Sequence, residues 1–143
     1  MATNPVSKVR VLLVCLGNIC RSPTAQGVLE KYIKDRGLEN HINVDSAGTG
    51  DWHVGSPPDP RAVHAARSRG YRIDQLLARQ VTHEDFQHFD YILCMDRTNL
   101  GALRELCPPA YRTRVRLLLD FADSSHDTVP DPYYGGAQGF DLV

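Results

Sequence analysis

The stretch KVRVLLVCLGNICRSP, residues 8–23, changes character halfway along its length. Residues 8–16 form a short apolar run rich in β-branched side chains, which is typical of a strand buried on both faces. From about Pro23 the apolar residues recur at helical spacing, and proline is favoured in the first turn of a helix. Gly37 is the expected end of this helix. The sequence therefore predicts a buried strand, a tight loop and a helix in direct succession.

The same alternation of strand and helix continues along the chain. Further strands are predicted at residues 42–48, 90–96 and 114–121. Helices are predicted at residues 60–70, after a capping box of Thr82 and Asp85, and at residues 99–106. Strands that alternate with helices require right-handed crossovers and form a parallel sheet. We therefore expect one α/β domain over residues 1–143, with a four-stranded, doubly wound parallel sheet and helices on both faces.

Composition excludes several classes of protein. The chain has 143 residues, of which 42% are hydrophobic and 23% charged, as expected for one globular domain with a core. With 16 basic and 17 acidic residues it lacks the broad basic surface of a nucleic-acid binder, so no nucleic-acid partner is expected. The apolar run at residues 11–16 is too short to span a membrane, and no leader precedes it. A cytoplasmic protein is therefore expected.

The four cysteines fit neither a zinc site nor a disulfide framework. They are Cys15, Cys20, Cys94 and Cys107, and no Cys-x2-Cys pair occurs among them. Reduced thiols are therefore expected, and no metal site is predicted. Cys94 lies inside a predicted strand and Cys107 precedes two prolines, so both are expected to be unreactive packing residues.

The segment between the first strand and the first helix carries the candidate chemistry. It lies at the carboxyl end of the strand, where open parallel sheets bind ligands. Gly17 permits a tight turn with inward-facing N–H groups, and the following helix adds its unpaired amides, so a phosphate would fit. Arg21 adds a planar donor fork for two phosphate oxygens. The same positive field favours the thiolate of Cys15, which becomes a nucleophile facing the phosphate.

Two neighbouring side chains are expected to support this loop. Ser22 would donate a hydrogen bond to the sulfur, and Asn18 would brace the loop by hydrogen bonds to the backbone. The expected phosphate-binding and supporting residues are Leu16, Gly17, Asn18, Ile19, Cys20 and Ser22. The alternative is that Cys15 is a small buried hydrophobe and Arg21 a solvated charge. The combination of Cys, Gly, Arg and Ser in one strand-to-helix turn favours the chemical interpretation.

These residues resemble a known family. Cys15 and Arg21 form a Cys-x5-Arg signature, and CLGNICRSP closely resembles the loop of low-molecular-weight protein tyrosine phosphatases. DPYYG at residues 131–135 resembles the acid loop of that family, and the segments SAGTGDWHVG, ARQ and DYILCMD are also similar to family segments. The resemblance spans nearly the whole chain. It implies a flavodoxin-like fold, phosphotyrosine-containing protein substrates or aryl phosphates, no cofactor, and a monomer.

The resemblance also implies a mechanism and a pocket. Expelling a phenolate at neutral pH requires a proton donor, and the family assigns this role to Asp131, which then acts as general base on a phosphocysteine intermediate. From the residues alone, Asp131 before proline is better explained as a turn starter. Trp52, Tyr133 and Tyr134 are expected as aromatic walls of the pocket, although Trp52 alone would equally suit the core or a surface anchor. Cys20 is implied as a redox partner that forms a reversible disulfide with Cys15.

The chain departs from the family pattern at two places. A histidine that steadies the loop in the family is replaced by Leu76, so a different supporting network is expected; His53 and His64 are left out of the catalytic set. Most of the usual final helix is also missing before Val143. Three alternatives remain: an arsenate reductase of the same fold, a phosphocysteine carrier, and a non-catalytic phosphotyrosine-binding module. The retention of both Cys15 and Asp131 disfavours the last.

Overall fold

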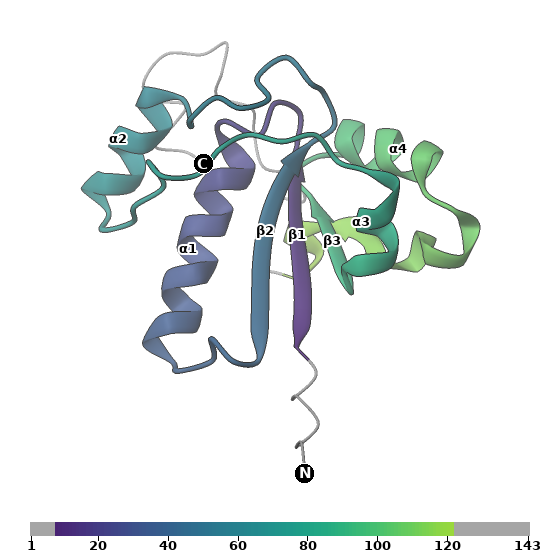
Figure 1. Cartoon of the computed structure of the whole chain (residues 1–143), viewed down its shortest axis with the longest axis horizontal. Helices are drawn as coiled ribbons and strands as arrows, with labels where there is room; N and C mark the ends of the chain where they lie inside the picture. The colour runs from purple at the N-terminus through teal and green to yellow at the C-terminus, as the bar shows by residue number, and fades with distance from the viewer. Residues whose placement is uncertain (1–7, 122–143) are drawn as a thin grey trace.

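A four-stranded parallel sheet forms the centre of the protein. The computed structural model describes residues 8–121. The strands lie in the order β2-β1-β3-β4 (Figure 1), as in a flavodoxin-like sheet, which confirms the predicted fold class. Their bounds are Val9–Cys15 for β1, Ile42–Gly48 for β2, Tyr91–Cys94 for β3 and Val115–Leu117 for β4. The strand that ends at the candidate nucleophile is therefore an inner strand.

Helices cover both faces of this sheet, as predicted. Helix α1 lies against β1 and β2 on one face, while α3 and α4 lie on the other (Figure 1). The helices are α1 (Arg21–Asp35), α2 (Pro60–Ser68), α3 (His83–His88) and α4 (Arg97–Leu106), with 3-10 turns η1 (Pro109–Arg114) and η2 (Leu118–Phe121). No helix among residues 8–121 is long and apolar enough to cross a membrane.

Local sequence signals predicted several helix ends correctly to within about two residues. Gly37 and Gly70 follow α1 and α2 with φ of 67° and 86°, the left-handed conformation that ends many helices. At the start of α3, the backbone N–H of Thr82 donates to the Asp85 carboxylate at 2.8 Å, which confirms the predicted capping box.

Several boundaries differ from the prediction: β3 spans Tyr91–Cys94 rather than 90–96, and α4 begins at Arg97 rather than at Asn99. Helix α1 begins at Arg21 rather than near Pro23, so the loop before it is shorter than expected. Strand β4 ends at Leu117 rather than at Phe121, because within residues 8–121 its partner is β3, which is four residues long and whose last residue, Cys94, pairs with Leu117. The chain beyond this last pair turns into η2 instead of extending the sheet.

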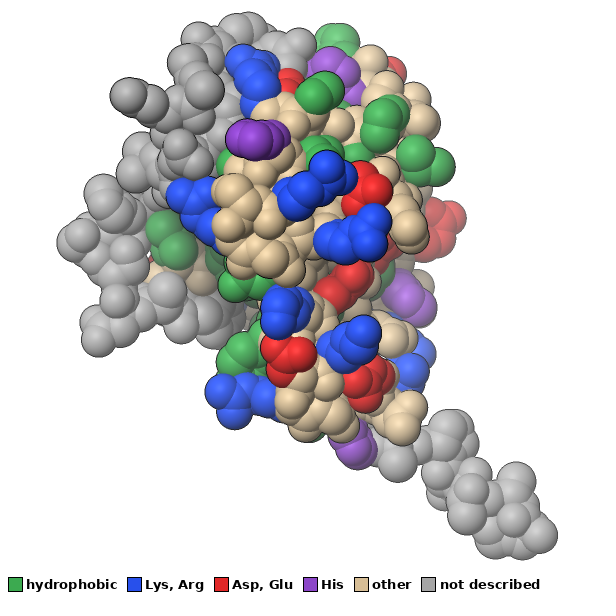
Figure 2. Space-filling view, turned by 90° about the vertical axis from the view of Figure 1, so that its left-hand side faces the viewer, with side chains coloured by type: hydrophobic (Ala, Val, Ile, Leu, Met, Phe, Trp, Pro, Cys, Tyr) green, Lys and Arg blue, Asp and Glu red, His purple; other side chains and the backbone are tan. Residues whose placement is uncertain are grey.

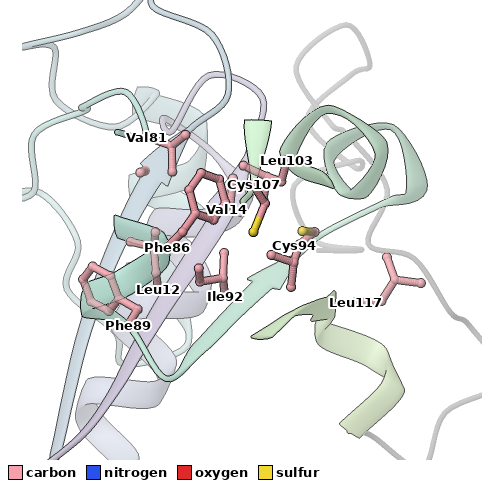
Figure 3. Close-up of a cluster of buried hydrophobic side chains, with 12 residues drawn as sticks. Leu12, Val14, Val81, Phe86, Phe89, Ile92, Cys94, Leu103, Cys107 and Leu117 are labelled. Carbon is pink, nitrogen blue, oxygen red and sulfur yellow. The ribbon is translucent and has the colours of Figure 1, made fainter. Parts of the chain in front are cut away.

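The two faces of β1 are buried in different clusters, as its continuous apolar run predicts. Leu12 and Val14 pack with Phe86 and Ile92 beneath α3 and α4 (Figure 3). The alternate residues of β1, from Val11 to Cys15, face the α1 side. Sheet burial on both sides therefore fixes the position of the strand that delivers Cys15.

The prediction that Cys94 and Cys107 are packing residues is confirmed by their burial in the cluster of Figure 3. Burial raises the pKa of the Cys94 thiol to about 12, and burial also raises the pKa of Cys107. Both side chains are therefore neutral thiols at physiological pH.

Charged side chains of both signs are interspersed over the face that carries α1 and α2 (Figure 2). On α1, Lys31 pairs with Asp35 at 3.0 Å, and just before α2, Asp59 pairs with Arg61 at 3.0 Å. Charges of both signs therefore alternate on this face.

Candidate active site

Residues 15–22 connect β1 to α1 and are called the phosphate loop below. Its backbone is held by a second segment, residues 49–59, which we call the wall loop because it contains Trp52. The N–H of Gly50 donates to the carbonyl of Leu16 at 2.9 Å, and the N–H of Asp59 donates to that of Ile19 at 2.8 Å. Both ends of the wall loop therefore rest on the phosphate loop.

The sulfur of Cys15 has polar neighbours within the phosphate loop. The backbone N–H of Asn18 donates to Sγ at 3.3 Å, and the hydroxyl of Ser22 lies 2.9 Å from it. Cys15 is buried, yet its sulfur lies within hydrogen-bond reach of these two polar groups of the loop.

Asn18 has an unusual backbone conformation that its side chain supports. Its φ is 58°, the left-handed region that asparagine adopts more readily than most residues other than glycine. The side-chain Oδ1 accepts from the backbone N–H of Arg79 at 3.0 Å. Arg79 is itself held by Asp45 of β2 at 3.1 Å and by Asp85 of α3 at 2.9 Å. Because two carboxylates hold Arg79 in place, its backbone N–H fixes the orientation of the Asn18 side-chain amide.

A chain of hydrogen bonds extends from Asn18 into α1. Its Nδ2 donates to the hydroxyls of Ser22 at 2.8 Å and Ser46 at 3.0 Å. The Ser46 hydroxyl donates to Oε1 of Gln26 at 2.6 Å, and Nε2 of Gln26 donates to Glu30 at 2.7 Å. Because Asn18 supplies the proton in both of its bonds, the Ser22 hydroxyl keeps its own proton for the sulfur of Cys15.

This chain of hydrogen bonds supports Asn18, and Leu76, at the position where a histidine was expected from the family pattern, takes no part in it. Leu76 is partly buried against the apolar cluster that contains Ile19, Cys20 and the alanines of α2. The support for Asn18 comes instead from Ser46 and from the backbone of Arg79. Sequence reasoning missed Ser46 and Gln26, because nothing in their local context distinguishes them from ordinary strand and helix residues.

Arg21 is held by a partner that the sequence analysis also missed. Its Nη1 lies 2.6 Å from Oδ2 of Asp96, and its side chain is only 2% exposed, which contradicts the alternative of a solvated charge. Asp96 is fixed in turn by the N–H of Asn99, which donates to Oδ1 at 2.8 Å at the start of α4. Asp96 follows β3 at the same sheet edge as Cys15, and this position is the signal that would have identified it.

Trp52 lies on the surface of the wall loop. Its side chain is 70% exposed, which excludes the alternative of a core residue. The ring lies over Gly50 so closely that a Cβ atom at that position would overlap it. The neighbouring His53 lies against the phosphate loop, since a Cβ built on Gly17 would be 3.0 Å from its Cδ2. An exposed aromatic ring thus lies beside the phosphate loop.

The loop geometry agrees with comparisons to known proteins. The model of the family described as "Low molecular weight phosphotyrosine protein phosphatase" matches residues 10–143. This chain belongs to that family. It is a cysteine-signature protein tyrosine phosphatase and therefore a hydrolase, as predicted.

Relatives of the phosphatase match along most of its length. It is 45% identical to the low molecular weight protein-tyrosine-phosphatase YfkJ of Bacillus subtilis, over 90% of this chain and 83% of that protein. It is 43% identical to the low molecular weight phosphotyrosine protein phosphatase of Schizosaccharomyces pombe, over 92% and 85%. A crystal structure of a protein tyrosine phosphatase from Entamoeba histolytica superposes with a TM-score of 0.90 at 42% identity, covering 94% and 86%. These matches do not favour the arsenate reductase or the non-catalytic binding module.

Several predicted residues of the phosphatase lie outside residues 8–121, namely Asp131, Tyr133 and Tyr134. Cys20 lies within residues 8–121: it is buried, is not part of a disulfide, and packs with Ile19 and the alanines of α2. Within residues 8–121, no group of three or more His, Cys, Asp or Glu side chains is arranged to hold a metal ion.

Proposed function

We propose that Cys15 is the nucleophile of this phosphatase and Asp131 its proton donor. The observation that carries the proposal is the position of the Cys15 sulfur, within hydrogen-bond reach of the Asn18 amide and the Ser22 hydroxyl. In the first step the thiolate attacks the phosphorus in line, so that an S–P bond forms as the bond to the phenolic oxygen breaks. Asp131 gives its proton to the departing phenolate, and a phosphocysteine remains.

Arg21 and the amides of the phosphate loop are proposed to hold the three equatorial oxygens of the transferred group. The ion pair between Arg21 and Asp96 supports this role, because it fixes a buried guanidinium beside the loop before substrate arrives. Preorganised donors of this kind stabilise the charge of the transition state without reorganisation. The loop residues proposed to take part are Leu16, Gly17, Asn18, Ile19, Cys20 and Ser22.

Hydrolysis of the phosphocysteine completes the cycle. Asp131, now a carboxylate, removes a proton from a water molecule whose oxygen attacks the phosphorus. The S–P bond breaks, inorganic phosphate leaves, and both the Cys15 thiolate and the protonated Asp131 are regenerated. The same loop donors serve the second step, because the transferred group keeps its three equatorial oxygens.

The substrates are proposed to be proteins that carry phosphotyrosine, acted on by a monomer in the cytoplasm. Trp52, Tyr133 and Tyr134 are proposed as aromatic walls against the phenyl ring. The exposure of Trp52 beside the phosphate loop supports the first of these assignments.

Cys20 is proposed to protect the nucleophile from irreversible oxidation. Peroxide oxidises the Cys15 thiolate to a sulfenic acid, and the Cys20 thiol then condenses with it, forming a disulfide and releasing water. Mass spectrometry after peroxide treatment checks this step. A Cys15–Cys20 linkage reversed by dithiothreitol is expected in the wild type, and sulfinic acid at Cys15 is expected in Cys20→Ser; equal sulfinic acid in both would contradict the role.

Hydrolysis of p-nitrophenyl phosphate across pH, with EDTA present, tests the main proposal. Cys15→Ser is expected to abolish turnover. Asp131→Ala is expected to lower it by about 10²- to 10⁴-fold and to remove the basic limb of the pH profile. Turnover that survives Cys15→Ser in a folded protein, or an unchanged pH profile in Asp131→Ala, contradicts the assigned roles.

A further inference from the structure

Three exposed apolar side chains lie on the two loops that support the phosphate loop. Among the large hydrophobic residues that the structure describes, Trp52, Leu77 and Val54 have the highest exposed fractions, at 70%, 66% and 55%. Single exposed apolar residues are common on protein surfaces, but exposed apolar residues grouped beside a site indicate a contact surface. These three residues are called the apolar rim below.

The backbone brings the members of the apolar rim together. Leu77 belongs to the segment 71–82, which precedes α3, while Trp52 and Val54 belong to the wall loop. The N–H of Gly55 donates to the carbonyl of Ala78 at 2.8 Å, and the N–H of Ala78 donates to that of Ser56 at 2.8 Å. Val54 immediately precedes Gly55 and Leu77 immediately precedes Ala78, so the two side chains lie on segments that are hydrogen-bonded to each other.

Each of these segments also touches the phosphate loop. In the wall loop, His53 lies against Gly17 and immediately precedes Val54. In the other segment, the Arg79 N–H donates to the side chain of Asn18 at 3.0 Å, two residues beyond Leu77. The apolar rim is thus continuous with the loop where the phosphate binds. Hydrophobic side chains also gather along the upper edge of the face in Figure 2, above the charged side chains that cover much of the rest.

We infer that the apolar rim binds an apolar side chain that flanks the phosphotyrosine of a protein substrate. The inference rests on the proposed binding of the phosphate at Cys15. Because the segments that carry the rim contact the phosphate loop directly, side chains beside the phosphotyrosine are placed to meet the rim. Because the rim carries no charge, it favours leucine, isoleucine, valine, methionine or phenylalanine over serine or a charged residue.

Peptide turnover tests the inference. Four phosphotyrosine peptides are compared, identical except for the residues beside the phosphotyrosine: serine on both sides, leucine on the amino side, leucine on the carboxyl side, and leucine on both. The measured quantity is the ratio of kcat/KM for a leucine peptide to that for the serine peptide, with p-nitrophenyl phosphate as reference. The wild type is expected to prefer at least one leucine peptide by about five- to tenfold.

Surface variants locate the preference on the rim. Leu77→Ser and Val54→Ser are expected to bring the ratio down towards one. The matched control is Leu106→Ser at the far end of α4, where a similar leucine is 46% exposed; it is expected to keep the wild-type ratio. Because the ratio cancels any uniform change in activity, a general loss of stability does not imitate the expected result.

Four outcomes would overturn the inference. An unchanged preference in both rim variants, or no preference in a wild type that hydrolyses p-nitrophenyl phosphate, refutes the rim as a docking surface and leaves the proposed function intact. If sedimentation velocity shows that the wild type is a dimer and Leu77→Ser is a monomer, the rim serves self-association instead. A wild type inactive on all substrates refutes the proposed function, and this inference with it.

Discussion

Cys15 and Cys94 occupy nearly equivalent places in the sheet and have opposite chemical environments. Both are buried free thiols, 3% and 0% exposed, at the carboxyl ends of the neighbouring strands β1 and β3. Yet the Cys94 thiol has a pKa of about 12, raised first by burial and then by the charge of Asp96, whereas the sulfur of Cys15 has hydrogen-bond donors around it. The local donors, rather than the degree of burial, distinguish a candidate nucleophile from a packing residue.

The register of the sheet explains the difference. Val14 pairs with Cys94, and both side chains point into the apolar cluster beneath α3 and α4. Cys15 follows Val14, so its side chain points to the opposite face, where the phosphate loop turns back over it. A single step along β1 therefore separates an apolar environment from a polar one.

The largest expected contrast comes from replacing each thiol separately. Cys15→Ser is expected to abolish phosphatase turnover and leave the fold intact. Cys94→Ala is expected to keep kcat/KM within about twofold while lowering the free energy of unfolding by about 1–2 kcal/mol, since it leaves a small cavity in a packed core. Urea denaturation and turnover of p-nitrophenyl phosphate measure both quantities. Loss of turnover in a folded Cys94→Ala protein would mean that the comparison is wrong.

The second effect concerns Asp96, which pairs with Arg21 of the phosphate loop and which, besides burial, also raises the pKa of Cys94. Asp96→Asn is expected to lower kcat/KM by about 10- to 100-fold, because a buried Arg21 loses its charged partner and its fixed orientation. The same change is expected to lower the pKa of Cys94, since Asp96 contributes to its rise. Asp74→Asn, which removes a looser pair with Arg72 at 3.8 Å, is the control. Equal activity of the two variants would exclude a positioning role for Asp96.

A smaller effect is expected from Gln26, which supports the phosphate loop at a distance. Gln26→Met removes the acceptor of the Ser46 hydroxyl and is expected to lower kcat about five- to tenfold, through a less firmly placed Ser22. KM is expected to stay within about twofold, which separates a loss of positioning from a loss of substrate binding. Lys31→Met, which breaks an exposed pair with Asp35, is expected to change neither quantity.

The smallest effect is a dependence of stability on pH. The folded pKa of Cys94 lies above its unfolded value near 9, so its contribution to stability is complete below that value and decreases as the pH rises towards about 12. Between pH 8 and 10 the wild type is therefore expected to lose about 1 kcal/mol relative to Cys94→Ala. Urea denaturation at pH 8, 9 and 10 measures the difference, and a constant difference would show that Cys94 does not titrate as described.

The elements that the sequence predicted well are those with local signals. The buried run of β1, the range of β2 and the capping box of α3 each depend on residues close together in the chain. The start of α1 and the end of β4 were misplaced, because contacts from distant segments decide them. Arg21 begins α1 where it meets Asp96, and β4 ends where β3 provides no further partner.

The candidate site shows the same division. Cys15, Arg21 and Ser22 could be recognised because they share one short turn with a known signature. Ser46 could not, because it looks ordinary in its own strand and gains its role only when the folded sheet brings it beside Asn18. Asp96 was missed, although its place at the carboxyl end of a predicted strand could have indicated it. The exposure of Trp52 also depends on tertiary packing, which a single tryptophan in a loop does not reveal.

The phosphate loop is made early in the chain but is supported by residues that are made late. Its last residue is Ser22, whereas the groups that hold Asn18 and Arg21 come from Ser46, Arg79 and Asp96. A ribosome delivers the chain from its amino end, so Cys15 emerges long before these supports exist. The supports of the phosphate loop are therefore complete only after β3 and the residues that follow it have been made and have joined the sheet.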